Sequence, residues 1–343
     1  MKRNGDWNTV GKRPVMIRIW NLVGIIGIAG TLLSLFSRWF WMADLASQLS
    51  VQYLILLIVG LPLWVRGRRR KTVLLAIAGL VWNLWMVLPY FVSSNSGIAD
   101  SEGVSAESFQ LAIFNVLRTN PEVPLTVAEA IGSDPDFLYL METGPDWKQP
   151  LEELSQEYPH QKVLCRDDYT GVAFLSRFPW ENLQVVDVPD PNPPLDVQFL
   201  IKGRRFRLIL THPLPPISPD LRIARDRQLL DLAASIEDET PTLLAGDFNL
   251  APWSGHFTHL LRTSQLHDLS TGFGIQPTLT PLPTLLGGVK VDHVLGNSRV
   301  SLVSFAVSPS QYSDHGVVCI GFRPTYSGPG ISRGAISRGH PNL

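Results

Sequence analysis

Three long apolar stretches occupy most of the first 92 residues and restrict what this part of the chain can form. They run over about residues 17–36, 45–65 and 73–92, and each approaches the roughly 20 residues that a helix needs to cross a bilayer. None carries charges along one face, as a helix lying on a membrane surface would. A single stretch of this kind could be a buried core helix, but three in succession with Trp near their ends favour a membrane module with three transmembrane helices within residues 1–92.

The charges between these stretches predict an orientation. Lys and Arg gather in the N-terminal segment and again at Arg66–Lys71, whereas Ser93–Glu107 contains neither. Loops rich in Lys and Arg stay on the cytoplasmic side. We therefore expect an integral, multi-pass membrane protein with a cytoplasmic N-terminus and everything after Val92 extracytoplasmic. A rival interpretation makes the first stretch a cleaved signal peptide, with Ala43–Ala46 as a weak processing site.

The two parts of the chain differ in charge. Residues 1–107 contain 11 Lys and Arg against 5 Asp and Glu, whereas residues 108–325 contain 16 against 25. The small, polar segment at 93–107 is typical of a linker. The Gly-, Ser- and Arg-rich tail at 326–343 is expected to be disordered. The membrane module at 1–92 is thus followed by one acidic domain, which we expect to span 108–325.

Within 108–325, β-rich segments alternate with segments of helical spacing, which predicts a mixed α/β sandwich. The phosphate-loop pattern Gly-x-x-x-x-Gly-Lys is absent from the sequence. The expected strands are Phe109–Leu117, Asp136–Glu142, Lys162–Cys165, Gly171–Leu175, Val197–Ile201, Arg205–Thr211, Thr242–Ala245, Val289–Leu295 and Val317–Phe322, and the expected helices are Leu125–Ile131, Trp147–Tyr158, Leu221–Ile236 and His256–Leu266.

The two cysteines, Cys165 and Cys319, lack the CxxC spacing of a thiolate metal site. Two buried thiols on separate strands are the favoured interpretation, because free Cys is among the most buried residue types. A single disulfide stays open if the domain is extracytoplasmic.

Acids, amides and histidines recur at the ends of the expected strands. A lone Asp after a strand is more often a turn or capping residue than a catalyst. Eight such side chains at successive strand ends are harder to explain in that way. Strand ends converge in space, so these side chains could line a single site. They are Asn115, Glu142, His212, Asp247, Asn249, Asp292, Asp314 and His315.

The segments around these residues resemble the motifs of the endonuclease/exonuclease/phosphatase superfamily, in the family's order and rough spacing across about 215 residues. The Gly-Asp-Phe-Asn and Ser-Asp-His motifs are weak alone, whereas all seven in order are a strong signal. The apolar N-terminal region lies outside the resemblance. The matching segments are Phe114–Leu117, Met141-Glu142, Gly171–Pro179, Thr211–Pro213, Gly246–Asn249, Val291–Val294 and Ser313–His315.

The resemblance implies a four-layer αββα sandwich of the DNase I type with one active site at the rim of both sheets. It also implies a hard divalent cation, Mg²⁺ or Mn²⁺, held by carboxylate and amide oxygens. Glu142 is the best candidate ligand, helped by Asn115 and by Asp314. Met141 stands where the family commonly has Gln, which we expect to loosen the support of Glu142 without removing a ligand.

The remaining residues are expected to carry the catalytic chemistry. Asp247 is placed to align a water or accept its proton, and His315 paired with Asp292 resembles the family's His–Asp dyad. Asn249 and His212 would donate hydrogen bonds to nonbridging phosphate oxygens, where negative charge grows.

Charge and anchoring bear on the substrate. Nucleic-acid binding relies on Lys and Arg, and the acidic domain shows no obvious basic stripe. A tethered domain meets lipid headgroups at high effective concentration. We therefore expect a membrane lipid, such as a phospholipid or polyprenyl pyrophosphate, as the phosphate-ester substrate. An extracytoplasmic nuclease and a catalytically inactive binding module remain as alternatives, and no protein partner is evident.

The predicted orientation has a direct test. Alkaline phosphatase fused at Ser96 should be active, because the Arg66–Lys71 cluster holds its loop in the cytoplasm. A cytoplasmic reporter at the same position is the matched control. An inactive phosphatase together with an active cytoplasmic reporter would contradict the orientation.

Overall fold

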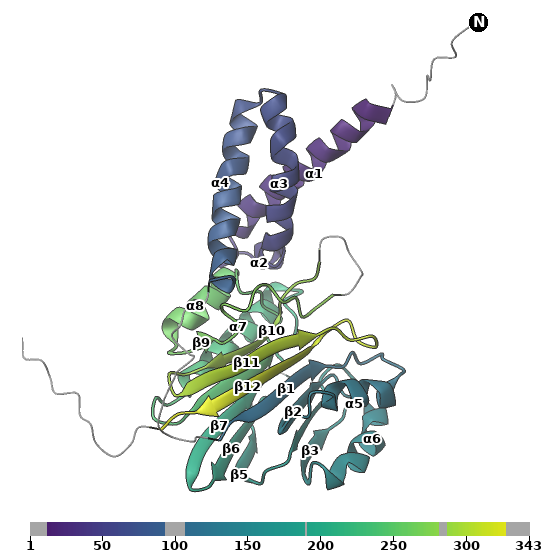
Figure 1. Cartoon of the computed structure of the whole chain (residues 1–343), viewed down its shortest axis with the longest axis vertical. Coiled ribbons are helices and arrows are strands. Elements are labelled where there is room, and N and C mark those ends of the chain that lie inside the picture. The colour runs from purple at the N-terminus through teal and green to yellow at the C-terminus, as the bar shows by residue number, and fades with distance from the viewer. Residues whose placement is uncertain (1–11, 93–106, 189–190, 281–286, 327–343) are drawn as a thin grey trace, which may run out of the picture.

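The computed structural model describes residues 12–92, 107–188, 191–280 and 287–326, with side chains from residue 18 onward. A two-sheet domain lies beneath a group of N-terminal helices (Figure 1). The expected linker and disordered tail lie outside the described residues, apart from Glu107 and Tyr326.

The described part of the domain contains two six-stranded sheets, with strand orders β11-β12-β1-β2-β4-β3 and β5-β6-β7-β8-β10-β9. The strands are β1 (Phe109–Asn115), β2 (Phe137–Met141), β3 (His160–Leu164), β4 (Val172–Ser176), β5 (Trp180–Val185), β6 (Leu195–Ile201), β7 (Arg204–Leu210), β8 (Thr242–Asp247), β9 (His267–Asp268), β10 (Asp292–Gly296), β11 (Val300–Ser308) and β12 (Val317–Pro324). The helices are α5 (Val123–Ile131), η2 (Pro145–Trp147), α6 (Lys148–Glu152), η3 (Glu153–Gln156), α7 (Pro219–Ala234) and α8 (Gly255–Thr263).

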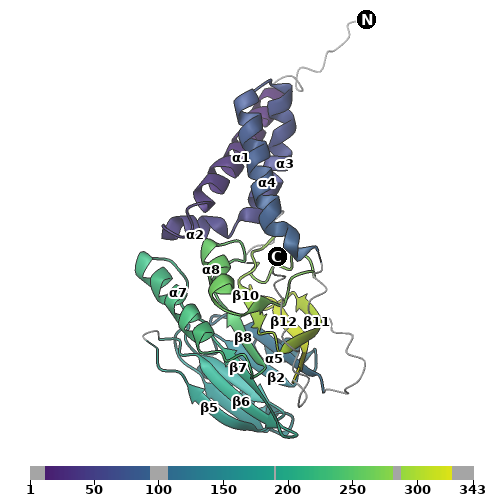
Figure 2. The same cartoon turned by 90° about the vertical axis from the view of Figure 1, so that its left-hand side faces the viewer.

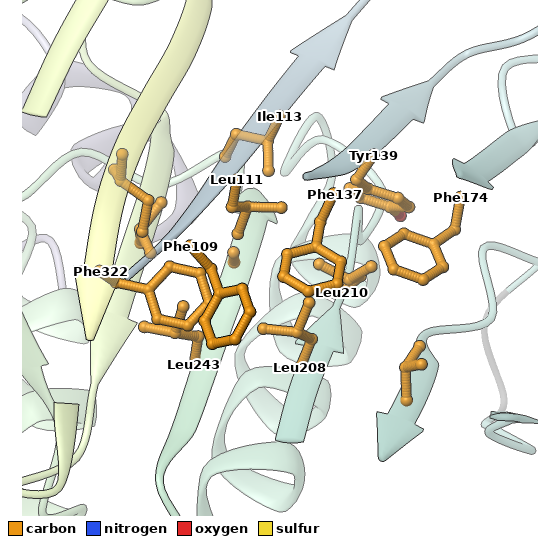
Figure 3. Packing of buried hydrophobic residues seen from close by; sticks show 14 of the residues in the cluster. Phe109, Leu111, Ile113, Phe137, Tyr139, Phe174, Leu208, Leu210, Leu243 and Phe322 are labelled. Atoms are coloured by element: carbon orange, nitrogen blue, oxygen red, sulfur yellow. The ribbon is translucent and has the colours of Figure 1, made fainter. Parts of the chain in front are cut away.

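An aromatic core joins the inner faces of the two sheets (Figure 3). Phe109 of β1 stacks on Phe206 of β7 at 5.3 Å between ring centroids, and Phe206 stacks on Phe199 of β6 at 4.8 Å. Phe137 of β2 lies 4.8 Å from Phe199. Such contacts across a sandwich fix the spacing and the register of its sheets.

The outer faces of the sheets are covered by helices. Because side chains alternate along a strand, Phe114 of β1 and Leu140 of β2 point away from the aromatic core and pack with α5 and α6. On the other sheet, Leu244 of β8 packs with α7 and α8 (Figure 2). The expected αββα sandwich is thus confirmed as two mixed sheets with helices outside.

Several boundaries differ from those expected. The helix expected at Trp147–Tyr158 is wrong, because this segment forms the short helices η2, α6 and η3, of which α6 contains Pro150. Strands β5, β9 and β11 were not expected: β5 and β9 are sheet edges, and β11 carries a register shift that interrupts its alternation. Both cysteines are free and half-buried, so the expected full burial is wrong, and Cys165 follows β3 instead of lying on a strand, whereas Cys319 lies in β12.

Strand direction brings the motif residues to one end of the sandwich. β1 runs parallel to β2, and β7 runs parallel to β8. β10 is antiparallel to β8, so its first residue, Asp292, lies beside Asp247 at the end of β8. β12 is antiparallel to β1 and begins next to the end of β1. The ends of strands from both sheets therefore lie at the same end of the sandwich, and the motif residues lie there with them.

The N-terminal helices pack side by side above this domain (Figure 1). Gly24 and Gly60 let the backbones approach closely, since a Cβ on Gly24 would lie 2.5 Å from the ring of Trp64. Asn83 donates to the hydroxyl of Thr31 at 2.8 Å between the helices. Small residues and interhelical hydrogen bonds of this kind are frequent between membrane helices. The helices are α1 (Lys12–Ser34), α2 (Trp41–Ser47), α3 (Ser50–Arg66), α4 (Arg70–Val87) and η1 (Leu88–Tyr90).

The expectation of three complete membrane spans is not supported. Judged by length and apolar composition, one helix among the described residues, Arg70–Tyr90, suffices to cross a membrane by itself. The span expected at 45–65 is broken, because α2 and α3 meet at an angle of 65° and would count as one span only together. The apolar part of the first helix, Arg18–Ser34, is shorter than a full span. On α2, ahead of the break, Asp44 faces the domain, where it is paired with Arg225.

Candidate active site

Asn115 and Glu142 lie next to each other at the ends of the parallel strands β1 and β2. The amide of Asn115 donates to Oε1 of Glu142 at 2.9 Å and to Oδ2 of Asp247 at 3.3 Å. The backbone N–H of Arg118 donates to the other oxygen of Glu142 at 3.1 Å. One amide therefore joins carboxylates that belong to different sheets.

Asp247 is the centre of the group. Its Oδ2 lies 3.6 Å from Nε2 of His212 and 3.8 Å from Nε2 of His315. Its Oδ1 accepts the backbone N–H of Asn249 at 2.8 Å. Burial raises the pKa of Asp247 to about 6, and the neighbouring charge of Asp292 adds to this effect.

Asp292 and His315 form a buried pair. Nδ1 of His315 lies 2.9 Å from Oδ2 of Asp292. Burial opposes the charged imidazolium, but the charge and hydrogen bond of Asp292 outweigh burial and raise the pKa of His315 to about 10. Burial likewise opposes the charged form of Asp292, and the charge and hydrogen bond of His315 bring its net pKa below the usual range. Each partner stabilises the charged form of the other.

The backbone is strained around these side chains. Glu142 and Asn249 have φ angles of 64° and 49°, in the left-handed region that few residues other than glycine adopt. Gly246 has a φ of 143°, and a Cβ there would lie 1.8 Å from the carbonyl oxygen of Thr211. The glycine of Gly-Asp-Phe-Asn is therefore required by the close approach of β8 to the end of β7.

Seven of the eight residues expected at the site converge: Asn115, Glu142, His212, Asp247, Asn249, Asp292 and His315. Asp314 differs from these. Its backbone carbonyl accepts a hydrogen bond from Thr280 N–H at 2.7 Å, and it is half-buried. Among the described residues, its carboxylate makes no hydrogen bond or ion pair with the other seven. In Ser-Asp-His, Ser313 instead donates to the carbonyl of Asn115 at 2.8 Å and accepts from His315 N–H at 3.0 Å.

The structure adds supporting residues that have no motif around them. The hydroxyl of Thr278 accepts the backbone N–H of Asp292 at 3.0 Å. The buried ammonium of Lys290 donates to the carbonyl of Asp292 at 3.2 Å, and Arg225 donates to the carbonyl of Asn249 at 2.8 Å. A Lys two residues before an Asp-His motif was the available signal for Lys290. Thr278 and Arg225 act across long sequence separations and left no local pattern.

Met141 makes a contact that the sequence did not predict. Its buried sulfur accepts the backbone N–H of Asp247 at 3.3 Å. The side chain thus supports the strand end that carries Asp247, whereas Glu142 is held by Asn115 and by the Arg118 N–H.

The donor set fits a hard divalent cation. Ligand atoms of Asp247, Asp292 and His315 lie within 4.8 Å of one another. Oδ1 of Asp292 is buried and has no hydrogen-bond partner among the described residues. Asn115 and Glu142 add oxygens beside Asp247. Clustered carboxylate and amide oxygens are the ligands that Mg²⁺ and Mn²⁺ prefer.

The raised pKa of His315 predicts a pH dependence of stability. Its folded value of about 10 exceeds the ordinary value of 6.5. The stabilisation from pairing with Asp292 is therefore complete below pH 6.5 and is lost as the pH rises through about 10. The melting temperature of the metal-free full chain should exceed that of His315→Gln most between the ordinary pKa of Asp292, 3.8, and pH 6.5, and the difference should shrink as the pH rises through about 10. A constant difference would contradict the pairing.

Comparison with solved structures supports the fold. The chain is similar to an endonuclease/exonuclease/phosphatase from Beutenbergia cavernae, with a TM-score of 0.55, 20% identity, and coverage of 64% of this chain and 72% of that chain. It is similar to TDP2 from D. rerio in complex with a single-strand DNA product, with a TM-score of 0.53, 15% identity, and coverage of 63% and 99%. It is also similar to the human Nocturnin catalytic domain with bound sulfate, with a TM-score of 0.52, 18% identity, and coverage of 64% of this chain and 95% of that chain.

No curated protein matches the chain. The model of the Endonuclease/Exonuclease/phosphatase family matches residues 80–315, which is more than half of the chain. The site described above lies within that match. The chain therefore belongs to the endonuclease/exonuclease/phosphatase family and is a metal-dependent hydrolase acting on phosphate ester bonds.

Proposed function

We propose that this protein is a membrane-anchored phosphoesterase that hydrolyses a lipid-linked phosphate or pyrophosphate at the outer face of the membrane. The observation that carries the proposal is the position of the site relative to the apolar helices. The guanidinium of Arg225 contacts both Asp44 of α2 and the carbonyl of Asn249. The site thus lies next to the domain-facing end of the N-terminal helices α1, α2, α3 and α4, which together form the helical module.

The surface of the helices supports membrane anchoring. Most of the large apolar side chains that are exposed among the described residues belong to the N-terminal helices, with Trp85 at 72% and Leu74 at 68% exposure. So extensive an apolar surface is rare on a soluble monomer. The α3–α4 turn, which carries Arg66–Arg70, lies at the end of the helices away from the domain (Figure 1). This arrangement is consistent with a cytoplasmic Arg-rich loop and an extracytoplasmic domain.

The proposed roles follow the geometry of the site. Glu142 and Asn115 would hold the cation, beside Asp247. When bound, the cation supplies neutralisation of phosphate charge and lowers the pKa of water. Asp314 is left out of this ligand set, because its carboxylate makes no hydrogen bond with the other residues among those described, although its charge acts on His315.

The chain's own acids and bases supply the proton transfers. With a pKa raised to about 6, Asp247 is largely ionised near neutral pH and accepts the proton of the attacking water. With a pKa raised to about 10, His315 is protonated and stabilises or protonates the leaving oxygen, while Asp292 fixes its ring. His212 and the second amide proton of Asn249 donate to nonbridging oxygens.

A nuclease is the second candidate, favoured by the similarity in fold to TDP2 in complex with single-strand DNA product. The distribution of basic residues argues against it. Lys202, Arg205 and Arg207 are paired with Glu107, Glu181 and Asp196. They lie on the β6–β7 hairpin, so Lys202 is roughly 30 Å from His212 along an extended strand. The third alternative, an inactive binding module, is disfavoured because Glu142, Asp247 and His315 are all present.

The substrate test uses the full chain in detergent or vesicles with Mg²⁺ or Mn²⁺. Sphingomyelin, phosphatidylinositol phosphates, undecaprenyl pyrophosphate, plasmid DNA and RNA are compared as substrates. We expect release of phosphate or headgroup from a lipid, abolished by chelator. Glu142→Gln should lower turnover by roughly two orders of magnitude or more, because a ligand charge is lost.

Glu153→Gln is the matched control, since Glu153 lies on η3, where its carboxylate accepts a hydrogen bond from Gln149 instead of from the site. Faster cleavage of DNA or RNA than of every lipid would favour the nuclease. Full activity in excess chelator would remove the metal mechanism.

The paired roles of His315 and Asp292 predict rate losses that do not multiply. His315→Ala should lower kcat by about 10³-fold or more. Asp292→Asn should fold and lose a large part of the same rate, because an amide favours the wrong imidazole tautomer. The double variant should be little worse than His315→Ala alone.

Specific activity and melting temperature are both measured on the folded full-length protein. Lower melting temperatures with unchanged specific activity would mean that the pair only stabilises the fold. Rate losses that multiply in the double variant would show that the two residues act independently.

A further inference from the structure

Asp44 is a fully buried carboxylate in the N-terminal helical region. It lies on α2, and its side chain is 1% exposed. A buried charge is tolerated when it is paired and hydrogen-bonded. Its partners lie in the domain: Arg225 of α7 at 2.8 Å and the hydroxyl of Ser254 at 2.6 Å. The helical module and the domain are therefore joined by a buried ion pair.

Arg225 contacts both Asp44 and a residue of the active site. Its side chain is 0% exposed. While Nη2 contacts Asp44, Nη1 donates to the backbone carbonyl of Asn249 at 2.8 Å. Nε and Nη2 also donate to Asp226, at 3.0 and 2.6 Å. A planar guanidinium held on several sides has little freedom, so its contact with Asn249 is fixed in direction.

Asn249 links Arg225 to Asp247, because it contacts both residues. Its φ of 49° is a strained conformation that needs support from its surroundings. Its N–H donates to Oδ1 of Asp247 at 2.8 Å, and its side-chain amide donates to the carbonyl of Pro213 at 3.1 Å. Arg225 holds the carbonyl side of the same residue. Releasing that carbonyl would free the rotation that follows the Cα of Asn249 and so loosen the residue whose N–H holds Asp247.

We propose that Asp44 is a positioning residue of the active site, which acts through Arg225 on the backbone of Asn249. The helical module is then a structural part of the site in addition to its anchor. This inference rests on the proposed roles of Asp247 and Asn249. It predicts that the catalytic rate depends on a side chain that never touches substrate.

A matched control comes from the same interface. The hydroxyl of Ser37, between α1 and α2, accepts the backbone N–H of Gly255 at 3.0 Å. Ser37→Ala removes a buried contact between the module and the domain without touching Arg225. A role in docking alone predicts similar effects for Ser37→Ala and Asp44→Asn, whereas a positioning role predicts a difference between them.

The first measurement is steady-state hydrolysis of bis(p-nitrophenyl) phosphate with Mg²⁺ by the full chain in detergent micelles. Because this probe is soluble, membrane access does not affect it. Asp44→Asn should lower kcat by about tenfold or more, since small displacements of catalytic groups cost large factors in rate. KM should stay within about twofold, and Ser37→Ala should change neither value by more than about twofold.

The second measurement is amide hydrogen exchange of the peptide containing Asp247–Leu250 in the metal-free protein. Asp44→Asn should speed its exchange, and Ser37→Ala should not. This readout does not depend on catalysis. If the wild type hydrolyses no phosphate ester, the proposed function fails, and the exchange comparison alone decides the positioning role.

Arg225→Lys covers the case in which Asp44→Asn does not fold. Lysine keeps a positive charge for Asp44, but its single ammonium does not reproduce the fork that also reaches Asn249. We expect a folded protein with lowered kcat. The inference is overturned if folded Asp44→Asn or Arg225→Lys keeps the wild-type kcat and exchange. It is equally overturned if Ser37→Ala lowers kcat as much as Asp44→Asn.

Discussion

Two carboxylates, Asp247 and Asp292, are buried beside each other where β8 and β10 pair, and the rest of the site depends on balancing their charges. Burial and mutual repulsion both disfavour two adjacent anions. The pKa of Asp247 is raised accordingly, whereas that of Asp292 is lowered by His315. One acid is therefore committed to its histidine, and the other remains responsive to a cation or a water proton. The same repulsion that costs stability gives the two acids different roles.

This balance explains why the site requires both sheets and the strained turns between them. Asp247 and Asp292 come from one sheet, whereas Asn115 and Glu142 come from the other. The aromatic core sets the distance between the sheets and thereby the distance between these donors. The left-handed backbone at Glu142 turns its carboxylate toward Asn115 immediately after β2 ends. The hydrogen bonds from Asn115 and from the Arg118 N–H hold Glu142 in this strained conformation.

Much of the fold and site could be predicted because the relevant signals are local. Strand-end polar residues mark where a buried strand meets the rim, so seven of the eight expected residues converge. Asp314 stays a prediction, because its carboxylate makes no hydrogen bond with the other seven among the described residues but its charge acts on His315. The continuous helix expected at 45–65 begins just after Asp44, which the sequence places in a loop. The structure buries Asp44 against Arg225, a residue distant in sequence. Contacts of this kind leave no periodicity, and the supporting roles of Thr278 and Met141 were hidden for the same reason.

The pairing of Asp44 with Arg225 also bears on how the protein reaches its mature state. The two residues are separated by 181 positions, so the contact closes a long loop of chain. Long-range contacts of this type form late, because the entropy of loop closure opposes them until the intervening parts are ordered. The helices are made first during synthesis, and α7 is completed only after half of the sandwich has been translated. Docking of the finished domain onto α2 would thus be the last step of assembly. Until that step, Arg225 lacks its contact with Asp44, and the backbone of Asn249 lacks the support that this contact gives.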